Sequence, residues 1–261
     1  MFEVIQSHRI EYEIIDCGTR RTMVFLHEGL GSVAMWKDFP ERCARAAGCT
    51  AVVYSRYGYG QSDPITEPRR PDYMHEEAVK SLPELLAKLG IERPILFGHS
   101  DGASIALIHA GVHPVAGVIV LAPHLFVEEI ALEGIRSIRA NYESGDLRAR
   151  LARYHANPDS AFWGWHDIWL HPDFRSWDIG DFVKKIQAPV LAIQGNNDEY
   201  GTMRHLDLIA GLVPGTTLLK LDRCRHSPHR DQPDAVVAAA AEFVRELNKP
   251  NGKETGSAHA I

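Results

Sequence analysis

Three polar side chains of this chain have the types and the order that acyl transfer requires. Ser100 lies in the pentapeptide at residues 98–102, Gly-His-Ser-Asp-Gly, and Asp198 and His226 follow it in the chain. A serine hydroxyl is a weak nucleophile until a base takes its proton, and the base needs a carboxylate that fixes its tautomer. We therefore expect Ser100 to be a nucleophile, His226 its base and Asp198 the acid that orients the base.

A sharp turn between a strand and a helix would hold Ser100 in place. Residues 94–97 form a short apolar run opened by a proline, which predicts a strand buried on both faces. Residues 103–110 are mostly small or aliphatic and run without a breaker, which predicts a buried helix. Side chains at Gly98 or Gly102 would collide with the crossing backbone, so the two glycines permit a strained turn that exposes the hydroxyl.

Asp198 and His226 also follow runs that predict strands. Residues 189–193 and 217–221 are largely apolar, and each run is followed by a turn that carries the acid or the histidine. In a parallel sheet flanked by helices, the carboxyl ends of the strands meet at one edge, where such proteins place their sites. The sequence therefore predicts that the serine, the acid and the histidine meet at this edge.

The other periodic segments predict an α/β fold, a mostly parallel sheet with helices on both faces. Strands are predicted at residues 10–15 (antiparallel to residues 4–5), 23–26, 51–54 and 117–121, and helices at residues 36–47, 73–89 with a kink at Pro83, 203–212 and 235–247. Residues 124–187 have helical periodicity and are too long for a loop. We expect a core at residues 1–123 and 188–248, an inserted helical cap at residues 124–187 and a disordered tail at residues 249–261.

Composition and charge exclude several classes of partner. The chain has 261 residues, of which 45% are hydrophobic, and its 28 Lys and Arg against 34 Asp and Glu give a net charge of −6 without charged blocks. This pattern predicts a folded protein that binds neither nucleic acid nor an anionic membrane surface. We expect no membrane span and no secretory signal.

The cysteines and the glycine-containing stretches do not predict a cofactor or a metal. The four cysteines lack metal-ligand spacing and are too few for a disulfide framework, which is typical of a cytoplasmic protein. The stretch Gly58-Tyr59-Gly60 lacks the last glycine of a dinucleotide-binding loop. We therefore expect no cofactor, no metal and a small-molecule ester as the partner, and the sequence leaves a homodimer open.

The order of serine, acid and histidine resembles that of the α/β-hydrolase superfamily, and the resemblance covers residues 10–247. It rests on the turn at Ser100, the Gly-x-x-Asp turn at Asp198 and the histidine loop at His226. The chain is similar to capped esterases of this superfamily, including the biphenyl hydrolase-like esterases with Ser-Asp-Gly at the same turn. The resemblance implies that these residues form a catalytic triad, with His226 rather than His229 as the base.

The resemblance also implies an oxyanion hole formed by the backbone N–H groups of Gly29 and Asp101. The superfamily has His-Gly where this chain has His27 and Glu28. Glu28 has two interpretations, a solvated loop residue or a carboxylate that binds a cationic or hydroxyl group of the substrate. Asp101 also has two, because its carboxylate could reach a substrate amine or satisfy the helix N-terminus.

Aromatic residues are concentrated in the predicted cap. Trp163, Trp165 and Trp169 could attach the cap to the core, or they could line the cleft and favour an apolar or aromatic group of the substrate. We therefore take these three tryptophans, together with Glu28, as the candidate substrate-binding residues.

These residues together predict a serine hydrolase that cleaves a small carboxylic ester through an acyl-enzyme. A lactonase, a thioesterase or a carbon–carbon bond hydrolase would use the same triad. In the last class a tryptophan commonly follows the histidine, where this chain has Ser227. Serine at the turn argues against the dehalogenases and epoxide hydrolases of similar fold, which have aspartate there. A haloperoxidase, a lyase or a ligand-binding receptor on this fold are less favoured alternatives.

Overall fold

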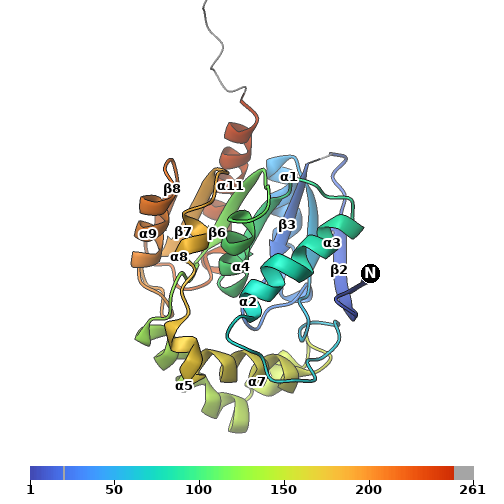
Figure 1. Cartoon of the computed structure of the whole chain (residues 1–261), viewed down its shortest axis with the longest axis vertical. Coiled ribbons are helices and arrows are strands. Elements are labelled where there is room, and N and C mark those ends of the chain that lie inside the picture. The colour runs from blue at the N-terminus through green and yellow to red at the C-terminus, as the bar shows by residue number, and fades with distance from the viewer. Residues whose placement is uncertain (20, 250–261) are drawn as a thin grey trace, which may run out of the picture.

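A sheet of eight strands organises the protein in a computed structural model that describes residues 1–19 and 21–249 (Figure 1). Its order is β1-β2-β4-β3-β5-β6-β7-β8. The strands are β1 (Phe2–Ile5), β2 (His8–Ile15), β3 (Thr22–Leu26), β4 (Thr50–Tyr54), β5 (Ile95–His99), β6 (Gly117–Leu121), β7 (Val190–Gly195) and β8 (Thr217–Leu221). β2 is antiparallel to β1 and β4, and the remaining pairs are parallel, so the predicted N-terminal hairpin and mostly parallel sheet are confirmed. The predicted tail, apart from Lys249, lies outside the described residues.

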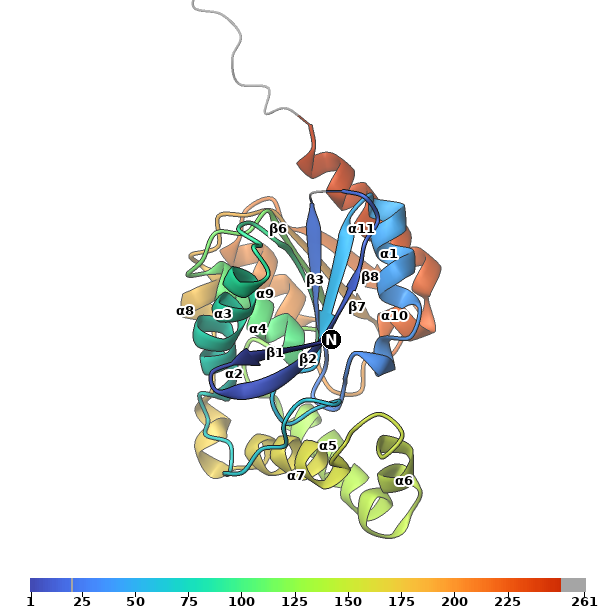
Figure 2. The same cartoon turned by 90° about the vertical axis from the view of Figure 1, so that its right-hand side faces the viewer.

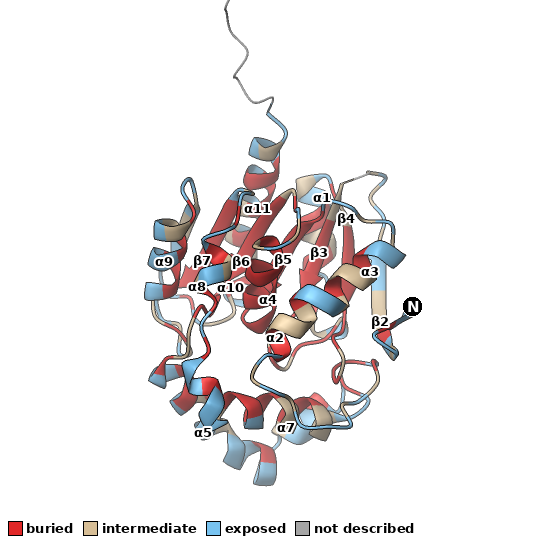
Figure 3. Cartoon of the chain, viewed as in Figure 1, coloured by how far each residue is buried: buried red, intermediate tan, exposed pale blue. Residues whose placement is uncertain are grey.

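Side chains of the parallel strands divide between two hydrophobic clusters, one on each face of the sheet. In β5, Leu96 packs into one cluster and Phe97 into the other, because successive residues of a strand point to opposite faces. Phe97 stacks on Phe25 of β3 at a ring-centroid distance of 4.8 Å. The central strands are buried throughout (Figure 3), which explains why they read as continuous apolar runs in the sequence.

Helices cover both faces of the sheet, as predicted (Figure 2). On one face lie η1 (Ala34–Trp36), α1 (Phe39–Ala47), α10 (Pro228–Asp231) and α11 (Pro233–Leu247). On the other face lie α2 (Tyr73–Glu76), α3 (Leu82–Lys88), α4 (Asp101–Ala110), α8 (Gly180–Val183) and α9 (Arg204–Leu212). No helix in the described part of the chain has the length and the apolar character needed to cross a bilayer.

The segment predicted as one kinked helix, residues 73–89, consists of three pieces. A π-helical turn, η2 (Glu77–Ser81), separates α2 from α3, and Pro83 lies in the first turn of α3. Proline has no N–H to donate, and its ring collides with the carbonyl four residues earlier, so the wider π turn absorbs the mismatch. Leu82 and Leu85 of α3 remain buried against the sheet.

The predicted insertion at residues 124–187 consists of helices and short turns. It contains α5 (Glu129–Ser144), α6 (Leu147–Leu151), α7 (Pro158–Trp169), η3 (Pro172–Ser176) and α8. Helices α5, α6 and α7, here called the cap helices, lie together at one end of the molecule, beyond the sheet (Figures 1 and 2). In contrast, α8 contacts α4 beside the sheet, so the last part of the insertion packs with the core.

Candidate active site

Ser100 occupies a sharp turn between β5 and α4. Its backbone has a φ of 52° and a ψ of −119°, which is strained for a residue with a side chain. A Cβ on Gly98 would lie 2.3 Å from the carbonyl oxygen of Gly102, and one on Gly102 would lie 2.1 Å from that of Leu26. The predicted collision at both glycines is therefore confirmed, and the turn requires them.

The loop after β7 holds the Asp198 carboxylate from several sides. Its Oδ1 accepts hydrogen bonds from the backbone N–H groups of Tyr200 at 2.8 Å and Gly201 at 3.2 Å. Its Oδ2 accepts one from the Gln194 side chain at 3.0 Å. Burial alone would raise the pKa of Asp198, but the charge and hydrogen bond of His226 and the Tyr200 N–H lower it. The carboxylate is therefore held in its charged form.

His226 bridges Ser100 and Asp198. Its Nε2 lies 2.9 Å from Ser100 Oγ, and its Nδ1 lies 2.8 Å from Asp198 Oδ1. Because a carboxylate only accepts hydrogen bonds, Nδ1 carries a proton, and the neutral ring keeps its lone pair on Nε2, facing the hydroxyl. Burial alone would lower the pKa of His226, but the carboxylates of Asp198, Glu199 and Glu28 raise it. The structure thus brings together the three residues predicted from the strand ends.

Two side chains that the sequence did not single out contact the backbone of His226. Glu199 Oε2 accepts the His226 N–H at 3.2 Å, and His99 Nε2 lies 2.8 Å from the His226 carbonyl oxygen. The only sequence signal for either role is adjacency, because Glu199 follows Asp198 and His99 precedes Ser100. Ser100 and Asp198 therefore hold the ring of His226, and the neighbours of these two residues hold its backbone.

The two predicted oxyanion donors belong to segments in backbone contact. Asp101 is the first residue of α4, so its backbone N–H group has no acceptor within the helix. Gly29 lies in the loop after β3, and the Leu26 carbonyl at the start of this loop touches Gly102 of α4. This packing places the loop and the helix N-terminus beside Ser100. The donor roles of Gly29 and Asp101 stay a prediction.

The buried side chain of Arg56 connects the loop after β3 with α4. The residue is only 1% exposed, and its Nη2 donates to the carbonyl oxygens of His27 at 3.2 Å and Glu28 at 2.9 Å. Its Nη1 lies 3.9 Å from Asp101 Oδ2. The sequence analysis did not single out Arg56 and so missed this role. The available signal was a charged residue two positions after a buried strand.

The Asp101 carboxylate is fully buried and hydrogen-bonded within the protein. It accepts a hydrogen bond from the Tyr73 hydroxyl at 2.7 Å and one from the Trp169 indole N–H at 3.2 Å. It therefore connects α4 to α2 and to α7, contacts that the sequence did not predict, while it lies in the first turn of α4. A substrate amine would have to displace one of these partners to reach it.

The Glu28 carboxylate also has partners within the protein. Its Oε1 lies 3.1 Å from Arg230 Nη2, and its Oε2 lies 3.5 Å from His99 Nδ1. Substrate binding by Glu28 stays a prediction, but both oxygens already face protein groups. Although histidines and a carboxylate gather here, no three His, Cys, Asp or Glu side chains among residues 1–19 and 21–249 are arranged to hold a metal ion.

Two of the three candidate tryptophans contact segments around Ser100. Trp169 reaches α4, and a Cβ on Gly29 would lie 2.1 Å from Trp165 Nε1, so the Trp165 indole rests on that glycine. Trp163 packs instead with Tyr142 among the cap helices, at a ring-centroid distance of 5.4 Å. Residues four apart share a helix face, so helical periodicity could have separated Trp163 from the other two. Substrate contact stays a prediction for all three.

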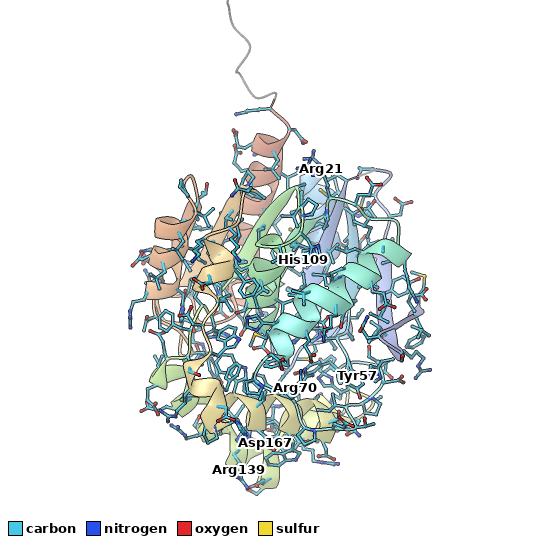
Figure 4. All side chains as sticks on the ribbon, viewed as in Figure 1. Arg21, Tyr57, Arg70, His109, Arg139 and Asp167 are labelled. Carbon is cyan, nitrogen blue, oxygen red and sulfur yellow. The ribbon has the colours of Figure 1, made fainter. Side chains whose placement is uncertain are left out.

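A cavity of about 530 Å³ lies beside the site, on the α2 side. Tyr57, Arg70 and Tyr73 are among its lining residues, and Figure 4 shows Tyr57 and Arg70 between the sheet and α7. A second cavity, of about 320 Å³, lies against α7 and shares residues 65–69 with the first. Tyr73 lines the larger cavity and donates a hydrogen bond to Asp101, so this side chain connects the cavity with the first residue of α4.

The sheet order, the strained serine turn and the hydrogen-bonded serine, histidine and aspartate are features of an α/β-hydrolase. The model of the family described as "Alpha/beta hydrolase family" matches residues 23–240. The chain therefore belongs to this family, and the predicted superfamily and fold are confirmed.

Relatives with assigned functions are similar to most of the chain. The human serine hydrolase BPHL is 23% identical over 75% of this chain and 69% of its own length. The 2-hydroxy-6-oxo-6-phenylhexa-2,4-dienoate hydrolase of Comamonas testosteroni is 23% identical over 88% of this chain and 90% of its own. The crystal structure of the enol-lactonase from Burkholderia xenovorans LB400 has a TM-score of 0.74 at 16% identity and covers 94% of this chain and 100% of its own. These names describe hydrolases of different kinds.

Proposed function

We propose that this chain is a serine hydrolase that cleaves a small carboxylic ester. One observation carries the proposal: Ser100 Oγ, His226 and Asp198 form a continuous hydrogen-bonded chain, with distances of 2.9 Å and 2.8 Å. The serine stands in a strained turn at a helix N-terminus. This arrangement supplies a nucleophile, a base and a group that orients the base, which are the requirements of acyl transfer.

The proposed reaction has two halves that use the same groups. Ser100 Oγ attacks the ester carbonyl carbon while His226 Nε2 takes the hydroxyl proton, and the N–H groups of Gly29 and Asp101 receive the oxyanion. The intermediate collapses, the alkoxide leaves with the proton from His226, and an acyl-enzyme remains. A water molecule then attacks the acyl carbon, gives its proton to His226, and the acid leaves as the serine regains a proton.

We infer that the substrate is uncharged near the nucleophile. The carboxylate of Asp101 is already bonded to Tyr73 and Trp169, so it is not free to pair with a cationic group. The Trp165 indole adds an apolar surface at Gly29. These contacts favour esters of small neutral acids over amino-acid esters.

A series of p-nitrophenyl esters with acyl chains of increasing length tests the proposed reaction. We expect the wild type to release p-nitrophenol, and we expect Ser100→Ala to lose this activity while it keeps the melting temperature of a folded protein. Turnover that survives in the variant would remove Ser100 from the mechanism. A folded wild type that hydrolyses none of these esters would overturn the ester hydrolase proposal.

A matched pair of substrates tests the inferred charge preference. Benzyl 3-methylbutanoate and L-valine benzyl ester differ only in the α-amino group of the acyl part. We expect a higher kcat/KM for the neutral ester, because the carboxylate of Asp101, the residue after Ser100, is already hydrogen-bonded to Tyr73 and Trp169. A preference for the valine ester would show that the amine displaces Tyr73 or Trp169 from Asp101.

A second candidate function is hydrolysis of a carbon–carbon bond. The similarity to the Comamonas testosteroni dienoate hydrolase over most of both chains favours it. Against it, Ser227 stands where carbon–carbon bond hydrolases of this fold commonly have a tryptophan. Incubation with 2-hydroxy-6-oxo-6-phenylhexa-2,4-dienoate, with Ser100→Ala as the control, decides between the two. Serine-dependent cleavage of the dienoate without ester hydrolysis would replace the first proposal.

A further inference from the structure

A buried histidine next to the nucleophile joins two loops of the candidate site. His99, the last residue of β5, is fully buried, and its Nε2 lies 2.8 Å from the carbonyl oxygen of His226. Its Nδ1 lies 3.5 Å from Oε2 of Glu28 in the loop after β3. One imidazole ring therefore connects the loop of the proposed base with the loop of the predicted oxyanion hole.

The chemistry of the two contacts determines the protonation of His99. A carbonyl oxygen can only accept a hydrogen bond, so Nε2 carries a proton. In a neutral ring, Nδ1 would then hold a lone pair that faces the lone pairs of the Glu28 carboxylate. With a second proton on Nδ1, the ring becomes an imidazolium and both contacts become attractive. The geometry therefore favours an imidazolium–carboxylate pair.

The charged and titratable groups around this pair agree with that assignment. Arg230 of α10 contacts Glu28, and the rings of His226 and His229 lie 5.3 Å and 4.7 Å from the ring of His99. Burial lowers the pKa of His229 well below its ordinary value, which keeps that ring neutral. Burial alone would raise the pKa of Glu28, but His99 and Arg230 hold it well below its ordinary value. Glu28 therefore keeps its negative charge.

The backbone leaves space for the Glu28 carboxylate at this position. A Cβ on Gly31 would lie 2.5 Å from Glu28 Oε2, so the absence of a side chain at Gly31 leaves room for the carboxylate in this orientation. The Glu28 side chain is 18% exposed, which leaves its carboxylate largely shielded from water. Because the resemblance predicts glycine at position 28, the contact between Glu28 and His99 is a departure of this chain from the superfamily pattern.

We propose that Glu28 and His99 form a buried ion pair that positions His226. The inference rests on the proposed function, because it takes His226 as the base. Glu28 keeps His99 protonated on both nitrogens, and His99 holds the His226 carbonyl through a charge-assisted hydrogen bond, about twice as strong as a neutral one. The anchored backbone keeps His226 Nε2 within reach of Ser100 Oγ. Both residues act through His226 and are positioning residues.

The isosteric variant Glu28→Gln tests the pair by kinetics. It removes the charge but keeps the size, and its amide can donate to the neutral Nδ1 of His99. We expect kcat for a neutral ester to fall by about three- to tenfold, because the hydrogen bond to His226 loses its charge assistance, and we expect an unchanged KM. The matched control is Glu41→Gln, which removes a carboxylate from the exposed pair with Arg45 on α1 and should change neither constant.

Nitrogen NMR of His99 tests the protonation directly. In the wild type, both ring nitrogens should have the shifts of protonated nitrogens, and in Glu28→Gln the Nδ1 signal should move to the unprotonated range. His99→Leu provides the assignment and should lower kcat by about ten- to a hundredfold without a change in KM. A wild-type Nδ1 without a proton would overturn the ion pair. A Glu28→Gln variant with unchanged kcat would overturn its positioning role, and a changed KM with unchanged kcat would return Glu28 to substrate binding.

The failure of the proposed function can be distinguished from the failure of this inference. If the wild type hydrolyses no ester, the rate at which a fluorophosphonate labels Ser100 replaces kcat, because this reaction needs the aligned serine and histidine but no ester substrate. We expect slower labelling in Glu28→Gln than in the wild type. Equal labelling rates would overturn the positioning role, and the NMR measurement needs no turnover at all.

Discussion

The indole N–H of Trp169 donates a hydrogen bond to the carboxylate of Asp101 at 3.2 Å, so the last residue of α7 is bonded to the first residue of α4. Because Ser100 directly precedes Asp101, this bond attaches the cap helices to the core beside the proposed nucleophile. A displacement of α7 would therefore act on the N–H group that we propose receives the oxyanion.

We expect Trp169→Phe to loosen α7. The loss of a hydrogen bond to a charged group costs about 1.5–3 kcal/mol in the free energy of unfolding. Tyr73→Phe is the matched control, since it removes the other hydrogen bond to the same carboxylate, at 2.7 Å, and leaves α7 attached. Both variants should lose similar stability, but only Trp169→Phe should accelerate amide hydrogen exchange in α7. Equal exchange rates in the two variants would argue against the attachment.

Arg56→Lys should impair catalysis in a protein that still folds. A lysine keeps the charge near Asp101, but its single ammonium cannot reproduce the forked contacts with the carbonyl oxygens of His27 and Glu28. A shifted oxyanion loop should lower kcat by about 10- to 100-fold. Arg69→Lys is the control, because Arg69, like Arg56, lies over the Tyr59 ring but donates its hydrogen bond to the Tyr57 carbonyl. Similar kcat values in the two variants would remove the special role of Arg56.

The pH dependence of kcat/KM should reveal the carboxylates around His226. The histidine acts as a base only when neutral, and its pKa is raised, against the effect of burial, by Asp198 and then by Glu199. Activity should therefore be lost on the acid side at a higher pH than an ordinary histidine would give. Glu199→Gln keeps an acceptor for the His226 N–H but removes the charge, so the pKa falls and the acid limb moves to lower pH. The control Glu41→Gln should leave the acid limb where it is in the wild type. An acid limb that is also unchanged in Glu199→Gln would contradict this assignment.

Much of the fold could be predicted because the sheet is buried on both faces. The apolar runs at residues 117–121 and 217–221 coincide with β6 and β8. β5 and β7 extend two residues beyond their predicted ends, to His99 and Gly195. The apolar pattern stops early there because the last residues of these strands are glycines and polar residues at the edge that carries the site. The positions of Ser100, Asp198 and His226 were predictable for the same reason, since each residue follows a strand.

The inward contacts of charged loop residues could not be predicted in this way. Glu28 faces His99 and Arg230, which are about 70 and 200 positions away in the chain, so only the folded structure brings them together. Arg56 could equally have pointed to solvent, since its direction depends on the carbonyl groups of another loop. Local sequence patterns report burial along one element, whereas these contacts depend on the packing of several elements.

His226, and not His229, should carry the turnover. His226→Ala removes the group between Ser100 Oγ and Asp198, so kcat should fall by at least about 10³-fold, as in other triads that lose their base. The ring of His229 lies 4.8 Å from that of Trp36, and burial keeps its pKa well below the ordinary value. His229→Ala should therefore lower the free energy of unfolding by about 1–3 kcal/mol and leave most of kcat. Ester hydrolysis measured well below the melting temperature of each variant separates the two effects, and loss of kcat in His229→Ala with retention in His226→Ala would move the base to the second histidine.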